Sequence, residues 1–179
     1  MIISIGLNSA EGRMKARDIT IISVCAALIA VCAWISVPAP VAFTLQTFGV
    51  FFALYLLGGR RGTLAVLVYL LLGSVGLPVF SGFRGGLGVL IGPSGGFIIG
   101  FLAAAIIIWM AESKTSRLCG SIFALLAVYF CGCLWYGLYS GEGFRGVFAV
   151  CALPYILPDI LKIWLAAFVA RKLEKQIKI

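Results

Sequence analysis

The stretch Ser94-Gly-Gly-Phe-Ile-Ile-Gly-Phe-Leu-Ala-Ala-Ala-Ile-Ile-Ile-Trp-Met-Ala111 contains no charged side chain. The hydrocarbon core of a bilayer is about 30 Å thick and needs roughly 20 helical residues, so this stretch predicts a membrane-spanning helix. The whole chain has the same character, because 63% of its 179 residues are hydrophobic and 11% are charged. Soluble domains carry roughly 25% charged residues. We therefore expect an integral membrane protein that forms a single transmembrane domain.

Five further apolar stretches extend the pattern to six predicted spans. The six cover residues 19–37, 46–58, 62–77, 94–111, 118–136 and about 150–170. The second and third are short, and we expect Gly59-Arg60-Arg61 to form a tight turn between them. The sequence predicts an all-α bundle of six transmembrane helices over residues 19–171, preceded by a cytoplasmic segment, 1–18, and followed by a basic cytoplasmic tail, 172–179.

The basic residues assign the connecting segments to the two sides of the membrane, because cytoplasmic segments carry an excess of Lys and Arg. With the N-terminus inside, the outer loops hold only Arg84 and Arg145. The inner segments hold Arg13, Lys15, Arg17, Arg60, Arg61, Lys114, Arg117, Arg171, Lys172, Lys175 and Lys178. An odd number of spans would destroy this bias, so we predict that both termini lie in the cytoplasm.

Several function classes do not fit this pattern. The net charge of +8 comes from short clusters between apolar runs, which is how membrane proteins place topology charges, and it does not indicate a nucleic-acid binder. No histidine is present to complete a zinc site or to act as a general base. The glycine-rich stretch has no following Gly-Lys-Ser/Thr and is not an ATP-binding loop. We expect no enzymatic activity, no metal and no cofactor.

Two of the connecting segments on the outer side depart from plain membrane helix. The segment 37–47 carries Pro38 and Pro40, which forbid regular helix, and its Thr44 and Gln46 bring hydrogen-bonding groups to the edge of the bilayer. The segment 76–96 mixes many glycines with Phe, Leu and Ile, and it predicts an ordered outer loop that caps a ligand pocket. Its Pro93-Ser94 pair indicates a helix start that could receive an anion. A rigid connector and a packed loop without a ligand remain the alternatives.

The third departure is the stretch Leu153-Pro-Tyr-Ile-Leu-Pro-Asp-Ile-Leu-Lys162 inside the last predicted span. Asp159 and Lys162 are three residues apart and share one helix face. Charges inside a membrane span are expensive unless they are paired or hydrated, so they usually mark a functional site. If this helix starts at Pro158 and runs to about Lys175, the pair lies near its outer end, at a cavity. We expect the pair to touch a polar ligand; a purely structural ion pair is the alternative.

Taken together, these regions resemble the biotin-specific substrate-binding (S) component of energy-coupling factor (ECF) transporters, the BioY family. The resemblance covers residues 18 to 172. The matching motifs are Phe43-Thr-Leu-Gln-Thr-Phe-Gly-Val50, Leu57-Gly-Gly-Arg-Arg-Gly62, Tyr69-Leu-Leu-Leu-Gly-Ser-Val-Gly-Leu-Pro-Val-Phe80, Gly85-Gly-Leu-Gly-Val-Leu-Ile-Gly-Pro-Ser-Gly-Gly96 and Leu157-Pro-Asp-Ile-Leu-Lys162.

The resemblance implies a protein in the cell membrane of a prokaryote that binds biotin from outside. It also implies three partner subunits, one transmembrane coupling subunit and two ATPases, which alone use ATP. The small residues Ala26 and Ala30 resemble the motif by which S components dock on the coupling subunit, and small residues permit close helix contact. We expect the ligand site to contain Thr44, Gln46, Phe80, Arg84, Gly86, Ser94, Tyr155, Asp159 and Lys162.

Biotin combines an apolar ring and chain with a ureido group and a carboxylate, and such a ligand suits an apolar cleft with a few polar groups. Asp159 can accept a hydrogen bond from a ureido N–H, while either Lys162 or Arg84 can pair with the carboxylate. Two other functions remain open at this point. The chain could be an S component for a different vitamin, or a structural membrane protein without a ligand.

Overall fold

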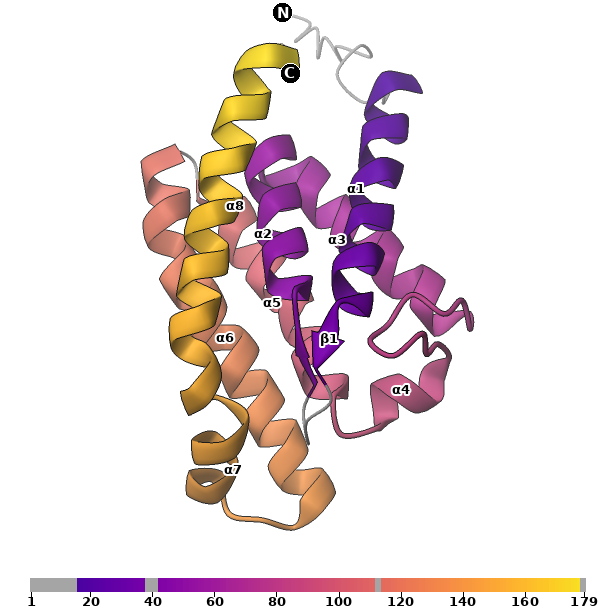
Figure 1. Cartoon of the computed structure of the whole chain (residues 1–179), viewed down its shortest axis with the longest axis vertical. Coiled ribbons are helices and arrows are strands. Elements are labelled where there is room, and N and C mark those ends of the chain that lie inside the picture. Colours follow the sequence, from indigo (N-terminus) through magenta and orange to yellow (C-terminus); the bar gives the residue numbers. More distant parts are fainter. Residues whose placement is uncertain (1–15, 38–41, 112–113, 178–179) are drawn as a thin grey trace, which may run out of the picture.

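The computed structural model describes residues 16–37, 42–111 and 114–177. Most of the predicted N-terminal segment, the two prolines of the first outer link and the last two residues therefore lie outside the described residues. The described part is mainly helical (Figure 1). Its elements are α1 (Ala16–Trp34), β1 (Ser36–Val37), β2 (Phe43–Thr44), α2 (Gln46–Leu57), α3 (Gly59–Ser74), α4 (Leu87–Ile91), α5 (Gly95–Met110), α6 (Lys114–Ser140), α7 (Phe144–Cys151), the 3-10 helix η1 (Leu153–Tyr155) and α8 (Ile156–Ile177).

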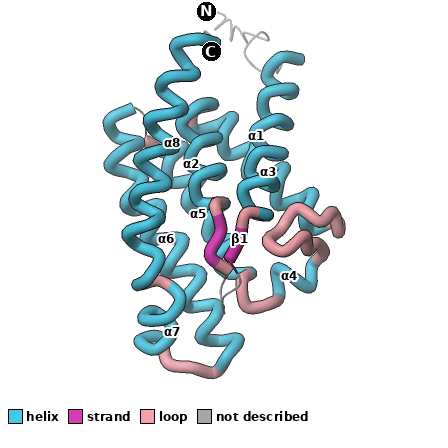
Figure 2. Tube along the Cα trace, viewed as in Figure 1, coloured by secondary structure: helices cyan, strands magenta, loops and turns pink. Residues whose placement is uncertain are grey.

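The helices pack as an elongated bundle. α5 packs along α6, α2 packs along α8, and α1 packs against both α2 and α3. α1 begins and α8 ends at the same end of the molecule (Figure 1). The longer loops and the two strands gather toward the opposite half (Figure 2). This half is the one in which the sequence placed the outer connecting segments.

Within the described residues, three stretches are long and apolar enough to cross a membrane: Ala16–Trp34, Arg117–Ser140 and Phe144–Gln176, which contains α7, η1 and α8. The apolar helices α2 and α5 are shorter, and α2 has 12 residues. At a rise of 1.5 Å per residue, α2 extends about 18 Å and reaches only part of the way across a bilayer core. β1 and β2 lie beyond its N-terminal end (Figure 1).

The first half of the chain differs from the sequence prediction in two places. The first helix ends at Trp34, and Ser36 and Val37 pair with Thr44 and Phe43 in a short antiparallel ribbon, so the chain is not entirely helical. The predicted turn at Gly59-Arg60-Arg61 is wrong, because α3 already begins at Gly59. The chain reverses at Gly58 alone, which has φ of 77°. Glycine adopts this backbone conformation without a steric penalty, so one residue is enough for the turn.

The last predicted span also has different bounds. The expected helix from about residue 150 is divided: α7 ends at Cys151, η1 carries Pro154, and α8 begins at Ile156. Proline has no N–H and cannot continue a regular helix, which explains the break. The alternative start at Pro158 is closer, since α8 begins two residues earlier and contains Pro158 in its first turn, where the missing N–H is tolerated.

Small residues on α1 face the interior of the bundle. Ala26 is 2% exposed and Ala30 is 5% exposed, and both belong to the hydrophobic core. The approach of α2 to α1 is close, because a Cβ added at Gly49 would lie 3.2 Å from the Ile29 Cα atom. Ala26 and Ala30 therefore pack inside the bundle, and their predicted role in docking a partner stays a prediction. These side chains are covered by the chain's own helices.

Candidate ligand-binding site

A pocket lies where β2, the N-terminal end of α2, the glycine-rich loop and helices α5, α6 and α8 meet. Its cavity volume is about 70 Å³, which is smaller than the roughly 300–1,000 Å³ of typical small-molecule sites, so a ligand of that size requires the walls to move apart. The residues that line it are Ala42, Phe43, Thr44, Gln46, Thr47, Phe80, Ser81, Arg84, Val89, Ser94, Phe97, Ile98, Phe101, Val128, Tyr129, Cys151, Tyr155, Asp159 and Lys162.

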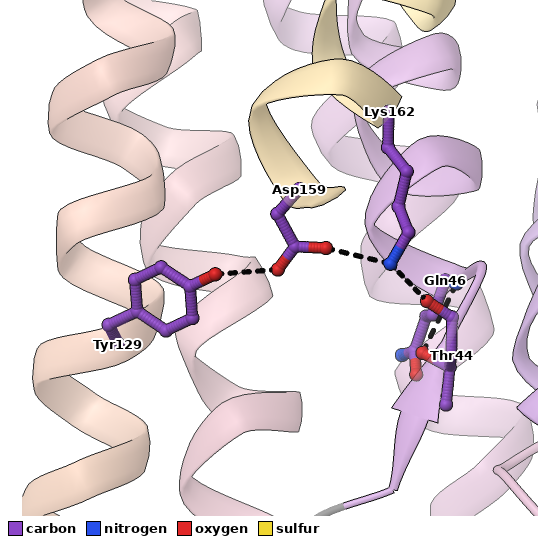
Figure 3. Close-up of polar contacts among 5 residues, drawn as sticks. All are labelled: Thr44, Gln46, Tyr129, Asp159 and Lys162. Atoms are coloured by element: carbon purple, nitrogen blue, oxygen red, sulfur yellow. Dashed lines mark hydrogen bonds and ion pairs between the residues drawn. The ribbon is translucent and has the colours of Figure 1, made fainter. Parts of the chain in front are cut away.

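A chain of polar contacts crosses one wall of this pocket (Figure 3). The Tyr129 hydroxyl donates a hydrogen bond to Oδ2 of Asp159 at 2.7 Å, and the Lys162 ammonium lies 2.8 Å from Oδ1 of the same carboxylate. Lys162 also donates to the backbone oxygen of Thr44 at 2.8 Å, and the Thr44 hydroxyl accepts a bond from the Gln46 N–H at 3.2 Å. Three separate segments of the chain, α6, α8 and the β2–α2 junction, are linked in this way.

The Asp159–Lys162 pair is nearly enclosed. Asp159 is 7% exposed and Lys162 is 9% exposed. The Lys162 Nζ atom lies 3.7 Å from the centre of the Phe43 ring, which in turn stacks on Tyr155 at 5.4 Å. An ammonium group has three donor hydrogens. Two of the three donors of Lys162 bond to oxygen atoms of the protein, and its ammonium also lies against the Phe43 ring.

The glycine-rich loop also lines the pocket, through Phe80, Ser81 and Arg84. The N–H of Phe80 donates to the Arg84 backbone oxygen at 2.9 Å, and the Arg84 Nε donates to the Ser81 oxygen at 3.1 Å. The Phe80 ring packs over Gly73, where an added Cβ would lie 2.1 Å from the ring. Arg84 is exposed, and within the described residues its guanidinium makes this single hydrogen bond. It is the cation of the pocket with donors left for a ligand.

The tip of the loop is attached to the end of α1. Phe83 stacks on Trp34 with ring centres 4.9 Å apart, and the Trp34 indole N–H donates to the Pro78 oxygen at 2.8 Å. Phe83 has φ of 56°, an uncommon conformation for a residue with a side chain. These contacts fix the short turn that carries Arg84. The loop is therefore held against the end of α1, and its predicted role as a cap over a ligand pocket stays a prediction.

Eight of the nine residues expected at the ligand site line this pocket; the exception is Gly86. Gly86 precedes α4 with φ of 91° and donates its N–H to the Gly73 oxygen, so it shapes the loop instead. Ser94 precedes α5, but its side chain makes no capping bond. Sequence reasoning missed Tyr129 and Phe43. One feature of the sequence indicates a role for Tyr129. It is a tyrosine within an apolar helix, and the hydroxyl of a buried tyrosine usually has a hydrogen-bond partner.

The site can hold a mainly apolar molecule and form hydrogen bonds or ion pairs with a few polar groups on it. Phe97, Ile98, Phe101 and Val128 provide apolar walls, and Asp159 provides a carboxylate that still has lone pairs for further donors. At the exposed side, Arg84 can bind an anionic group. The pocket thus suits an elongated ligand with N–H donors at one end and a negative charge at the other.

Comparison with known proteins gives consistent relatives. The BioY family model matches residues 8–179. The biotin transporter BioY of Thermotoga maritima is 44% identical over 154 residues, covering 83% of this chain and 90% of the relative. The probable biotin transporter BioY of Pyrococcus horikoshii is 40% identical over 162 residues, covering 90% and 98%. The crystal structure of the S-component for biotin from an ECF-type ABC transporter superposes with a TM-score of 0.81 at 28% identity, covering 91% of this chain and 95% of that one.

Proposed function

The chain belongs to the BioY family, and from this premise we propose that it is the biotin-binding membrane subunit of an ECF-type vitamin transporter. The observation that carries the proposal is the agreement, over nearly the whole chain, between relatives named as biotin transporters and a solved S-component for biotin. Those relatives are named as transporters or as an S-component, and we propose no catalytic step.

The chemistry of the pocket supports biotin as the ligand. The thiophane ring and valeryl chain match the apolar walls. Asp159 accepts a hydrogen bond from a ureido N–H, using a lone pair that neither Tyr129 nor Lys162 occupies. The valerate carboxylate pairs with Arg84, because two of the three Lys162 donors already bond to protein oxygens and Lys162 lies next to the Asp159 carboxylate, which repels a second anion. Biotin then lies with its ureido ring inward and its carboxylate toward the exposed side.

The membrane arrangement belongs to the same proposal. α1, α2, α3, α5, α6 and α8 form one six-helix domain with both termini in the cytoplasm of a prokaryote. Biotin enters from outside, beneath the glycine-rich loop. A coupling subunit and two ATPases drive its release inward. The short helix α2 suits this arrangement, because non-helical backbone at membrane depth is tolerated where it lines a cavity.

Calorimetry with the detergent-purified chain tests the function and its site together. We expect biotin to bind with nanomolar-range affinity, roughly −11 to −12 kcal/mol. Asp159→Asn removes the negative charge with little change in shape, and we expect it to weaken binding by at least tenfold, or about 1.4 kcal/mol. Glu142→Gln is the matched control, because Glu142 is exposed in the α6–α7 loop, and it should bind as the wild type does.

Two results would count against the proposal, each in its own way. If the wild-type chain binds thiamine or riboflavin and not biotin, or binds none of them, the function is wrong. If it binds biotin and a well-folded Asp159→Asn variant keeps the same affinity, the function stands and the pair has only a structural role.

A further inference from the structure

We infer that Gln46 is a specificity-determining residue whose side-chain amide donates a hydrogen bond to the ureido oxygen of biotin. The inference rests on the proposed function and adds to it the group that recognises the one acceptor on the ring. Asp159 accepts a hydrogen bond from an N–H of the ureido group, and Gln46 donates one to its carbonyl oxygen. Together they distinguish a urea from other five-membered rings of the same shape.

The first observation is an unpaired donor in a buried position. Gln46 is 4% exposed, it lines the pocket, and its Nε2 atom has no hydrogen-bond partner among the described residues. Buried polar side chains in folded proteins are nearly always hydrogen-bonded. A buried donor without a partner costs about 1–3 kcal/mol, so one that faces a ligand pocket indicates an acceptor on the ligand.

The second observation is the position of Gln46 beside the Asp159–Lys162 pair. Its N–H bonds to the Thr44 hydroxyl, the Thr44 carbonyl bonds to Lys162, and Lys162 pairs with Asp159 (Figure 3). Gln46 is the first residue of α2, so its backbone is held by a helix and not by a loop. The donor and the acceptor that a urea requires, Gln46 and Asp159, therefore lie on two neighbouring helices, α2 and α8.

The chemistry of the ligand completes the match. A ureido group presents one carbonyl oxygen between two N–H donors, and its recognition needs a donor opposite the oxygen and an acceptor beside it. Gln46 Nε2 supplies the donor and Asp159 supplies the acceptor. Sites that hydrogen-bond a substrate group discriminate strongly against analogues that lack it, because their buried polar atoms are then left unpaired. The biotin analogue iminobiotin is such a probe, since it carries a cationic guanidinium with N–H donors where biotin has the acceptor oxygen.

The test measures the ratio of the affinities for biotin and iminobiotin in the wild-type chain and in three variants. Gln46→Met keeps the length of the side chain and removes the donor, and we expect the preference for biotin to fall about tenfold. Gln46→Glu replaces the donor by an acceptor with a negative charge, and we expect a larger fall, about a hundredfold, because charged hydrogen bonds are roughly twice as strong. Gln176→Glu is the matched control, since Gln176 is exposed near the C-terminal end of α8, and its ratio should stay at the wild-type value.

A measurement on the wild-type chain does not depend on any variant folding. The sequence contains two glutamines, Gln46 and Gln176. In protein labelled with 15N at glutamine side chains, we expect saturating biotin to shift the amide signals of Gln46 and to leave those of Gln176 in place. An unchanged Gln46 signal, or an unchanged affinity ratio in folded Gln46 variants, overturns the inference while biotin binding itself stands. Failure of the wild-type chain to bind biotin would instead overturn the proposed function.

Discussion

At the scale of single residues, the pocket separates two cations that the sequence could not rank. Lys162 and Arg84 are both on the outer side of predicted spans, and either could meet a carboxylate on charge alone. The structure distinguishes them by their partners: Lys162 contacts Asp159, the Thr44 carbonyl and the Phe43 ring, while Arg84 bonds only to the Ser81 oxygen within the described residues. Partners distant in sequence, such as Phe43 and Lys162, come together only in the fold.

This difference predicts opposite results for the two alanine variants. Biotinamide lacks the negative charge of biotin, so the ratio of the two affinities measures the contact to the carboxylate. We expect Arg84→Ala to reduce this ratio at least about tenfold, since a charged hydrogen bond contributes about 1.5–3 kcal/mol. Lys162→Ala should weaken the binding of both ligands and leave their ratio nearly unchanged, because its main effect is to leave Asp159 unpaired. The reverse pattern in calorimetry would assign the carboxylate to Lys162.

At the scale of helices, the sequence predicted those features that depend on local pattern. The start of α2 at Gln46 and the region of α5 follow from apolar runs bounded by proline and glycine, and the shared face of Asp159 and Lys162 follows from their spacing in a helix. The sequence analysis did not resolve α7 as a separate helix, because its apolar residues continue into those of α8 and only Pro154 marks the break. It also could not tell which face of α1 is buried, since α1 is apolar nearly all round and its inner face is decided by α2 and α3.

The burial of Ala26 changes what a large side chain there should do. Ala26 is 2% exposed, and its neighbour Ala27 is exposed on the same helix. Forcing extra atoms into a packed core typically costs about 1–3 kcal/mol, and an indole in place of a methyl group should exceed this range. We expect Ala26→Trp to lower the melting temperature sharply and to lose biotin binding, while Ala27→Trp, the matched control, keeps both. Equal melting temperatures in a thermal-shift assay would show that α1 has no packed inner face at this position.

At the scale of the whole molecule, the placement of charge agrees with the placement of the pocket. Arg61 at the start of α3 pairs with Asp18 on α1 at 3.2 Å, near the end where α8 also terminates. The glycine-rich loop lies toward the other half (Figure 1). The pocket is lined by residues of this loop and of the N-terminal ends of α2 and α8. A bilayer oriented by the excess of Lys and Arg would put this basic end inside and the pocket outside. The side of the membrane that the ligand site faces thus depends on the number of times the chain crosses the membrane. The lengths of α2, α3 and α5 do not fix this number, because each helix is shorter than a bilayer core.

Cysteine labelling in cells measures this orientation. One cysteine at a time is introduced at Ala16, Arg145 or Lys175, in a chain whose exposed Cys119 and half-buried Cys131 are replaced by serine; the other four cysteines are buried. With six spans and both termini inside, a membrane-impermeant maleimide should label Arg145→Cys in intact cells. It should label Ala16→Cys and Lys175→Cys only after the cells are permeabilised. Labelling of Ala16→Cys and Lys175→Cys from opposite sides would require an odd number of spans. Labelling of both from outside would place the pocket on the cytoplasmic face, where it could not receive biotin for uptake.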